Sequence, residues 1–345
     1  MFANLERTNV AELHLHRDPH SGLRALIAIH STQLGPAVGG CRCLRYDDED
    51  AALEDVTRLA RGMSYKAALA GLPLGGGKAV ILEPPDGYDR GALYRAFGRA
   101  VDSLNGRYTT AVDAGTRLED LDQVARATRH VWGYSGDGLD PSPLTALGVF
   151  AALDASVRQR LGRDSLRGLH FAVQGVGHVG SRLALLLTRA GARLTLADAD
   201  AKRAGELAAR LGAWIVPADA IYDVPCDGFV PCALGAVLNR DTIARLRAPL
   251  VAGSANNQLA GDEDGERLRQ RDILYAPDYV TNAGGLIALA LGHAGAGRTR
   301  IRQQVLAIGT TLTQIFREAE RAGWSTSATA DDLAEQRLNG HRNVA

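Results

Sequence analysis

Apolar residues recur with two different spacings over the first 135 residues, and both regular structures are therefore predicted there. Short apolar runs predict three strands, at 23–29, 79–82 and 108–112. Apolar residues three or four positions apart predict amphipathic helices at about 53–63 and 93–104. Two glycine-rich segments lie among these elements, and we expect a bend at 35–40 and a loop at 71–77.

The pattern changes beyond a Gly-, Pro-, Ser- and Asp-rich segment at 133–143, which we interpret as a linker or hinge. Short apolar runs then alternate with helical stretches. The predicted strands are 169–174, 193–197, 213–216, 228–230, 250–252 and 273–275. Such alternation is typical of a parallel, doubly wound sheet. The C-terminal part is predicted to be helical, with an apolar stripe from Ile301 to Ile315 that belongs to the core.

Length and composition limit the classes of protein that fit this pattern. A chain of 345 residues suits two domains, each with its own core. Lys+Arg and Asp+Glu number 39 each, so no basic surface for nucleic acid is expected. The longest apolar stretches fall far short of the roughly 20 residues that cross a bilayer, so no membrane partner is expected. The first residues lack the apolar run of a signal peptide, and we expect a cytoplasmic protein.

The four cysteines indicate neither a disulfide framework nor a metal site. They are too few to staple a chain of this size. Cys41 and Cys43 are one residue apart, which is not the usual spacing of zinc ligands. We expect buried or partly buried thiols and no bound metal.

A glycine motif, Gly175-Val-Gly177-His-Val179-Gly180, follows the predicted strand at 169–174 and opens a helix. Glycines allow a tight turn and bring a helix N-terminus close to a pyrophosphate. Asp198 ends the next predicted strand, where a carboxylate accepts both ribose hydroxyls of NAD and repels the 2′-phosphate of NADP. The motif therefore predicts an NAD site, and a tight turn without a ligand is the alternative.

Three ionisable residues are candidates for chemistry. Lys66 and Lys78 flank a glycine run, and Asp113 follows a predicted strand. The run is not a phosphate-binding P-loop, because Leu72 stands where that motif needs its first glycine and Ala79 where it needs Ser or Thr. A lysine in a partly buried site loses proton affinity and becomes a usable base near neutral pH. Surface lysines and a turn aspartate are the alternative interpretation.

Eight segments, in this order along most of the chain, resemble signatures of the glutamate/leucine/phenylalanine/valine dehydrogenase superfamily. They are 31–42, 63–81, 108–116, 141–150, 168–180, 226–238, 251–259 and 273–287. The stretch Gly71-Leu-Pro-Leu-Gly-Gly-Gly-Lys-Ala-Val-Ile81 is highly specific for that superfamily. Within it, the motifs Pro231-Cys-Ala-Leu-Gly and Gly253-Ser-Ala-Asn-Asn-Gln-Leu are most similar to the leucine dehydrogenases.

The resemblance implies an α/β protein of two domains. An N-terminal α/β domain over 1–135 would bind substrate, contain the catalytic residues and form oligomers, and a C-terminal helix at about 322–345 would rejoin it. A Rossmann-type doubly wound domain over 136–321 would bind NAD. The resemblance also implies a homo-oligomer, in which exposed faces of the first domain are covered.

The resemblance also implies the reaction, an oxidative deamination of a small amino acid by NAD. Lys66, with the backbone near Gly39, would hold the substrate carboxylate. Lys78 would be the general base that activates water, and Asp113 would shuttle protons to and from the substrate nitrogen. Asn257 would position the substrate amine. The residues expected to contact the cofactor are Thr145, Gly175, Gly177, Val179, Gly180, Asp198, Cys232, Ala233 and Asn256.

The residues expected to contact the substrate side chain are all apolar: Val38, Ala111, Leu286 and Leu289. Glutamate-specific relatives have a lysine at the Val38 position. A second carboxylate would be unpaired here at a cost of several kcal/mol, which excludes glutamate. We expect leucine, with valine and isoleucine. Phenylalanine or a broad range of apolar amino acids is the alternative, because Val112 and Ala114 depart from the pattern of leucine and valine dehydrogenases.

A function of another class is a catalytically silent NAD-binding protein that uses the same fold for regulation. Loss of Lys66, Lys78 or Asp113 would favour it, and all three are present.

Overall fold

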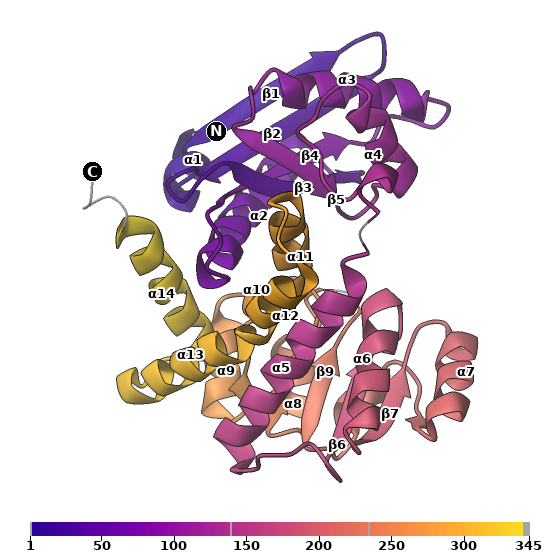
Figure 1. Ribbon diagram of the computed structural model, residues 1–345, viewed down its shortest axis with the longest axis vertical. Coiled ribbons are helices and arrows are strands. Elements are labelled where there is room, and N and C mark those ends of the chain that lie inside the picture. Colours follow the sequence, from indigo (N-terminus) through magenta and orange to yellow (C-terminus); the bar gives the residue numbers. More distant parts are fainter. Residues whose placement is uncertain (1, 139, 234, 341–345) are drawn as a thin grey trace. The chain divides into compact units, whose positions relative to one another are not determined.

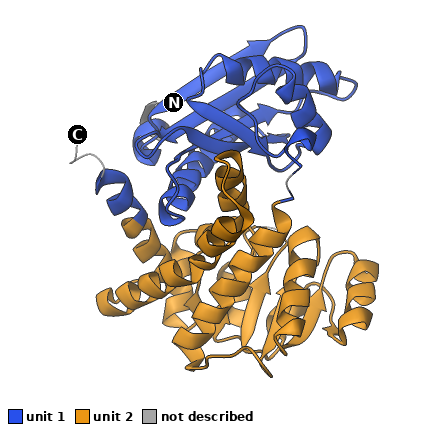
Figure 2. Cartoon of the chain, viewed as in Figure 1, with its two compact units in different colours: residues 1–140, 334–345 blue, residues 141–333 orange. Residues whose placement is uncertain are grey.

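The computed structural model describes residues 2–138, 140–233 and 235–340, and the chain forms two compact units (Figure 2). Unit 1 comprises residues 1–140 and 334–345, and unit 2 comprises 141–333. The first boundary lies five residues beyond the predicted one, because Ser135 is still hydrogen-bonded to Asp122 of unit 1, Oγ to Oδ2 at 2.8 Å. The chain returns to unit 1 at residue 334, partway along helix α14 (Thr326–Gly340), and not at about 322.

Unit 1 contains a mixed five-stranded sheet in the order β1-β2-β4-β3-β5. The strands are β1 (Glu12–Asp18), β2 (Leu23–Ser31), β3 (Ala37–Leu44), β4 (Gly75–Leu82) and β5 (Tyr108–Val112). The β1–β2 and β2–β4 pairs are antiparallel, whereas β3 is parallel to both β4 and β5. The carboxyl ends of β3, β4 and β5 therefore lie at one edge of the sheet.

Helices cover both faces of this sheet (Figure 1). Alternate residues of β2 point to opposite faces, as the period of a strand requires. Leu26 and Ala28 join the core beneath α2 (Glu49–Leu69), and Ile27 and Ile29 join the core beneath α3 (Arg90–Asp102) and α4 (Leu118–Ala125). The short helix α1 (Phe2–Thr8) precedes β1.

Residues 37–40 and 75–77 are strand, so the predicted bend at 35–40 is wrong over most of its length and the predicted loop at 71–77 is wrong over its last three residues. In these strand stretches glycine is needed for close approach and not for turning. A Cβ on Gly39 would lie 1.7 Å from the Gly77 carbonyl oxygen, and one on Gly76 would lie 2.0 Å from the Ser64 nitrogen in α2. The glycines thus allow α2 and β3 to pack directly against β4.

Unit 2 contains six parallel strands in the order β11-β10-β9-β6-β7-β8. They are β6 (His170–Gln174), β7 (Arg193–Ala197), β8 (Trp214–Ile215), β9 (Gly228–Pro231), β10 (Leu250–Val251) and β11 (Leu274–Tyr275). This is the doubly wound nucleotide-binding order, and the strand order reverses between β6 and β9. The predicted fold class is confirmed.

Helices connect and flank these strands. They are α5 (Ser142–Leu161), α6 (His178–Arg189), α7 (Ala201–Leu211), α8 (Arg240–Arg245), α9 (Glu263–Gln270), α10 (Asp278–Thr281), α11 (Gly284–His293), α12 (Arg298–Leu306) and α13 (Ile308–Ala322). The long helix α5 packs against α6, α11, α12 and α13. The apolar stripe from Ile301 to Ile315 is buried, as predicted. Among the described residues, no helix is both long and apolar enough to cross a membrane.

Candidate active site

An ion pair between Lys78 and Asp113 lies in unit 1 beside Cys41 of β3, which pairs with Ala79 of β4 and with Val112 of β5. Lys78 is in β4, and Asp113 directly follows β5. The Lys78 Nζ donates to Asp113 Oδ2, and the two side chains are only 8% and 15% exposed. The structure thus brings together a lysine and an aspartate that are 35 residues apart in sequence.

The turn after β5 fixes the Asp113 carboxylate. Its Oδ1 accepts from the backbone N–H of Ala114 at 2.6 Å, and its carbonyl accepts from the N–H of Thr116 at 3.0 Å. Gly115 has a φ of +76°, and a Cβ there would lie 1.8 Å from the Cys43 carbonyl oxygen. A glycine is therefore required for the turn to close against β3 and to hold Asp113 opposite Lys78.

The Lys78 amine has a lowered proton affinity. Burial, and after it the positive charges of Arg42 and Lys66, lower the pKa of Lys78 to about 7. The Asp113 carboxylate acts in the opposite direction, because it favours the ammonium form. An amine with a pKa close to neutrality is suited to general base catalysis.

Lys66 is half-buried in α2, the helix that Gly76 allows to pack closely on β4. It lies near enough to Lys78 to lower the pKa of that amine. Lys66, Lys78 and Lys202 are the chain's three lysines, and every other one of its 39 basic residues is arginine. Two of the three lysines therefore belong to one cluster. Arginine could not replace Lys78 as a base, because its guanidinium stays protonated.

The other candidates in unit 1 lie on strands beside this cluster. Val38 and Gly39 are in β3, where Val38 is 2% exposed and the Gly39 carbonyl accepts from the buried Tyr108 hydroxyl at 2.6 Å. Ala111 is half-buried in β5 and pairs with Gly40. The Tyr108 hydroxyl thus holds the Gly39 backbone in β3, the strand that lies between β4, which contains Lys78, and β5, which Asp113 follows.

Arg42, Asp55 and Tyr46 form a second charged group beside the ion pair, and sequence reasoning gave none of them a role. Arg42 Nη1 donates to Asp55 Oδ2 at 2.8 Å, and the Tyr46 hydroxyl donates to the same oxygen at 2.7 Å. Arg42 Nη2 is 3.9 Å from Asp113 Oδ1. The sequence feature that could have pointed to Arg42 is its position in the motif Gly39-Gly40-Cys41-Arg42.

In unit 2 the glycine motif forms the turn between β6 and α6. Gly175 has a φ of +92°, and a Cβ on Gly180 would lie 2.0 Å from the Gly175 carbonyl oxygen. A Cβ on Gly177, at the start of α6, would meet no atom within 4 Å. Gly175 and Gly180 therefore shape the turn, while the space beside Gly177 leaves room for a pyrophosphate at the helix N-terminus. Val179 is half-buried in the first turn of α6.

Asp198 follows β7 and is tied to the same turn. Its Oδ2 accepts from the Val176 N–H at 2.8 Å, and its Oδ1 accepts from Arg203 at 2.7 Å and from the Asp200 N–H at 2.9 Å. Burial alone would raise the pKa of Asp198, but the hydrogen bonds from Arg203, Val176 and Asp200 outweigh it and lower the pKa. Asp198 is thus a fixed, ionised carboxylate, which suits the ribose of a dinucleotide.

Cys232 and Ala233 complete this turn from the end of β9. A Cβ on Gly175 would lie 2.7 Å from the Ala233 Cβ, and one on Gly180 would lie 3.3 Å from the Cys232 Cβ. All four cysteines of the chain are free thiols, and burial raises the pKa of Cys232. The structure therefore gathers this part of the predicted cofactor site at the carboxyl ends of β6, β7 and β9.

Asn256 and Asn257 lie in the loop after β10. Asn257 has a φ of +51°, and its N–H donates to Asp278 Oδ2 at 2.7 Å. The exposed Asn256 accepts through Oδ1 from Asn282 at 2.8 Å. The Asn257 carbonyl accepts from the Ala236 N–H at 2.6 Å, which joins this loop to the one after β9.

Three further candidates of unit 2 lie on helices. Thr145 is half-buried in α5, and a Cβ on Gly285 would lie 2.8 Å from its Oγ1, so α5 and α11 pack closely there. Leu286 and Leu289 are both in α11, where Leu286 is half-buried and Leu289 is buried.

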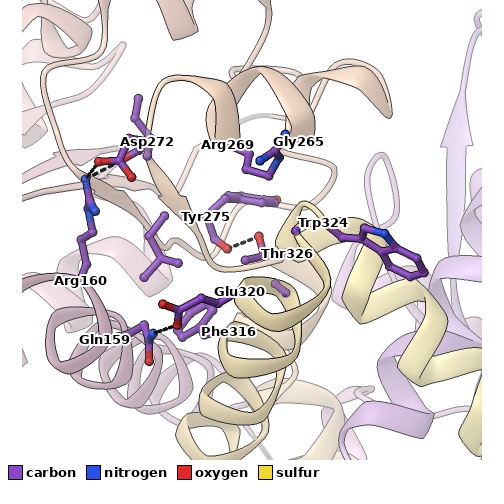
Figure 3. A pocket seen from close by; sticks show the side chains of 14 residues that line it. Gln159, Arg160, Gly265, Arg269, Asp272, Tyr275, Phe316, Glu320, Trp324 and Thr326 are labelled. Atoms are coloured by element: carbon purple, nitrogen blue, oxygen red, sulfur yellow. Dashed lines mark hydrogen bonds and ion pairs between the residues drawn. The ribbon is translucent and has the colours of Figure 1, made fainter.

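A cavity of about 320 Å³ in unit 2 lies among other residues (Figure 3). Charged and aromatic side chains line it, with Arg160 paired to Asp272 and Gln159 donating to Glu320 at 3.3 Å. The predicted site residues are all described, and none of them lines this cavity. Its charged groups are already paired within the protein, Arg269 with Glu266 outside the lining, so the candidate site is defined by the two clusters above.

The sequence matches two family descriptions. Residues 7–130 match "Glu/Leu/Phe/Val dehydrogenase, dimerisation domain", and residues 200–336 match "Glutamate/Leucine/Phenylalanine/Valine dehydrogenase". Leucine dehydrogenase from Thermoactinomyces intermedius is 46% identical over 100% of this chain and 95% of its own length. Phenylalanine dehydrogenase from Caldalkalibacillus thermarum is 44% identical over 93% of this chain and 89% of its own length.

A solved structure is similar over the same extent. The crystal structure of L-tryptophan dehydrogenase from Nostoc punctiforme has a TM-score of 0.88 and 40% sequence identity, and the match covers 99% of this chain and 100% of that chain. The resemblance found in the sequence is therefore confirmed. The chain belongs to the glutamate/leucine/phenylalanine/valine dehydrogenase family, and it is an amino-acid dehydrogenase, an oxidoreductase that depends on a pyridine nucleotide.

Proposed function

We propose that the protein catalyses the reversible, NAD-dependent oxidative deamination of a branched-chain L-amino acid, leucine with valine and isoleucine, to the 2-oxo acid and ammonia. The observation that supports this most is the buried Lys78–Asp113 pair with a second lysine, Lys66, beside it. The reaction needs one cation for the substrate carboxylate and two groups that move protons. The cluster supplies all three.

The proposed division of labour follows from the position of each group. Lys66, half-buried and near Lys78, holds the substrate carboxylate together with the backbone at Gly39. Lys78, whose pKa is about 7, takes a proton from the water that attacks the imino carbon. Asp113 exchanges protons with the substrate nitrogen and with Lys78, to which it is hydrogen-bonded. Asn257 orients the substrate amine.

The proposed nucleotide is NAD, which accepts a hydride from the substrate Cα when it is bound. The glycine turn, with its open space at Gly177, fits a pyrophosphate, and Asp198 fits the two ribose hydroxyls. Cys232, Ala233 and Asn256 hold the nucleotide from the neighbouring loops, and Thr145 contacts the nicotinamide carboxamide. The ionised Asp198 disfavours a 2′-phosphate, so NADP should be a poor substitute.

The proposed substrate class rests on the apolar character of Val38, Ala111, Leu286 and Leu289. None of these four can pair with a side-chain carboxylate, which supports exclusion of glutamate. The similarity to leucine dehydrogenases over the full chain supports leucine.

A second candidate, phenylalanine or a broad range of apolar amino acids, has its own support. Phenylalanine dehydrogenase from Caldalkalibacillus thermarum is 44% identical, within two percentage points of the leucine enzyme named above. One methylene of side chain changes discrimination by only about 1–3 kcal/mol, so small changes in a pocket redirect such an enzyme.

We also propose that the protein is a homo-oligomer. The family description that matches residues 7–130 is that of a dimerisation domain. The edge strand β1 in this region has a 60% exposed leucine, Leu15, which suits a surface covered by a second copy. Light scattering on the purified protein tests this, and a monomer across the micromolar range would contradict it.

Substitution of the proposed proton carriers tests the mechanism. Lys78→Ala and Asp113→Asn should each lower kcat for leucine deamination by at least about 100-fold, because each removes a proton-transfer step. Binding of NAD, followed by fluorescence titration, should barely change. Lys202→Ala is the matched control, since this exposed lysine on α7 is the chain's third. Near-normal turnover in either site variant would show that the proposed residues are wrong.

A further inference from the structure

The position of Arg42 beside the Lys78–Asp113 pair is not explained by neutralisation of Asp113. Its Nη2 is 3.9 Å from Asp113 Oδ1, beyond hydrogen-bonding distance, while its Nη1 is 2.8 Å from Asp55 Oδ2. Lys78 and the Ala114 N–H already occupy the two Asp113 oxygens. Arg42 is therefore anchored by another carboxylate and presents its charge toward the ion pair without joining it.

Asp55, which anchors Arg42, is itself held by further hydrogen bonds. Arg42 and Asp55 are 16% and 13% exposed, the Tyr46 hydroxyl donates to Asp55 Oδ2, and Arg58 approaches Asp55 Oδ1 at 3.4 Å. The Arg42 Nε is buried and has no hydrogen-bond partner within the described ranges. Burial of a guanidinium with an unsatisfied donor costs free energy. Such an arrangement suggests that its position serves a purpose other than stability.

We infer that Arg42, held by Asp55 and Tyr46, is a positioning residue for the reaction: it places a fixed positive charge beside the Lys78–Asp113 pair, and this charge favours the neutral, proton-accepting form of Lys78. This inference rests on the roles proposed above for Lys78 and Asp113. To those roles the inference adds Arg42 as a group that controls the protonation of Lys78.

The charges that face Lys78 oppose one another. Arg42 and Lys66 disfavour its ammonium form, whereas Asp55 favours it, as Asp113 does through the direct ion pair. The buried Cys41 thiol, whose own pKa is raised by burial, also acts on Lys78 and raises its pKa. Loss of the Arg42 charge should therefore raise the pKa of Lys78, and loss of the Asp55 charge should lower it.

The test uses Arg42→Gln, Arg42→Lys and Asp55→Asn in the full chain. Arg24→Gln is the matched control, because Arg24 also joins a strand of this sheet to a carboxylate of α2, Glu49, but is 55% exposed. The first readout is the pH dependence of trace acetylation at Lys78, measured by peptide mass spectrometry with Lys202 as the internal reference. The second is the pH dependence of kcat/KM for leucine deamination.

In Arg42→Gln the midpoints of Lys78 acetylation and of the acidic limb of kcat/KM should both rise by roughly one pH unit. At a pH below both midpoints, kcat/KM should then be about tenfold lower than in the wild type, and it should recover at alkaline pH. In Arg42→Lys both midpoints should stay close to the wild-type values, because the positive charge is kept. Asp55→Asn should move the Lys78 midpoint down, and Arg24→Gln should leave it unchanged.

If Arg42 has only a structural role, a different result is expected. A folded Arg42→Gln protein with the wild-type Lys78 midpoint and a pH-independent loss of kcat/KM would overturn the inference. If Arg42→Gln does not fold, Asp55→Asn decides, and an unchanged or raised Lys78 midpoint overturns the inference. Acetylation reports on Lys78 without turnover, so these outcomes stay separate from failure of the proposed function, which Lys78→Ala activity measures.

Discussion

The ionisation of one amine determines how this protein should respond to pH. Lys78 is almost fully buried, and burial with the nearby charges of Arg42 and Lys66 lowers its pKa to about 7. In the proposed mechanism of deamination Lys78 is the base, and it must be neutral before it can accept a proton. Protonation as the pH falls through about 7 therefore removes the active form.

The wild-type pH profile tests this directly. For leucine deamination kcat/KM should rise with pH through about 7 and level off above it, with a slope of one proton on the acidic side. Acetylation of Lys78 should follow the same midpoint. Lys78→Arg should abolish the rise along with the activity, because a guanidinium stays protonated. A flat profile between pH 6 and pH 9 would contradict the assignment of Lys78 as the base.

Nucleotide choice is likewise proposed to depend on one side chain. Asp198→Ser removes the carboxylate and frees Arg203, which now donates to Asp198, for a 2′-phosphate. The ratio of kcat/KM for NAD over NADP should therefore fall at least about tenfold. Asp200→Ser is the control: it removes a charge two residues away and keeps a side chain that can cap α7 in place of Asp200. Equal ratios in wild type and Asp198→Ser would contradict the role given to Asp198.

Among the elements, the contact of α2 with β4 has the largest consequence for the site. Ser64 packs against Gly76 at a distance that excludes any side chain, and this contact sets where Lys66 lies relative to β4. The glycine run was predicted to be a loop because glycine is rare in strands. The close approach that explains it depends on Ser64 of α2, twelve residues before Gly76, and no local pattern reveals that contact.

Gly76→Ala tests this contact. Its Cβ would lie 2.0 Å from the Ser64 nitrogen, so α2 or β4 must move, and we expect a loss of stability of about 1–3 kcal/mol or more. Gly62→Ala is the control, because Gly62 is also in the α2 region but a Cβ there meets no atom within 4 Å. Thermal unfolding should show a lower Tm for Gly76→Ala alone. Equal Tm values for the two variants would exclude the contact.

The periodicity of apolar residues predicted the buried strands and the helices that bury one face. The alternation of strand and helix after residue 169 gave the parallel sheet of unit 2, and the stripe from Ile301 to Ile315 gave its helical packing. Strand β1 escaped notice because its residues, such as His14 and Leu15, are mostly half-exposed at a sheet edge. Asp55 and Tyr46 had no local signal either, because their contacts with Arg42 form only in the folded chain. The signal for Arg42 was its place in the motif Gly39-Gly40-Cys41-Arg42.

At the scale of the whole molecule, the two units contain different parts of the proposed chemistry. Unit 1 contains Lys66, Lys78 and Asp113, and unit 2 contains the glycine turn and Asp198. The proton carriers and the nucleotide residues can therefore be changed independently. Lys78→Ala should leave NAD affinity intact, while Asp198→Ser should leave the pH midpoint of kcat/KM intact.

One measurement tests most directly whether this protein deaminates branched-chain amino acids with NAD. It is kcat/KM at saturating NAD for leucine, valine, isoleucine, phenylalanine and glutamate, followed by the formation of NADH. We expect leucine to be preferred, with valine and isoleucine close behind. Glutamate should be at least about 1000-fold worse, because its second carboxylate would be buried without a partner. A preference for phenylalanine would contradict the proposed branched-chain substrate but would be compatible with the proposed mechanism. Glutamate turnover equal to that of leucine would contradict the proposed apolar contacts with the substrate side chain.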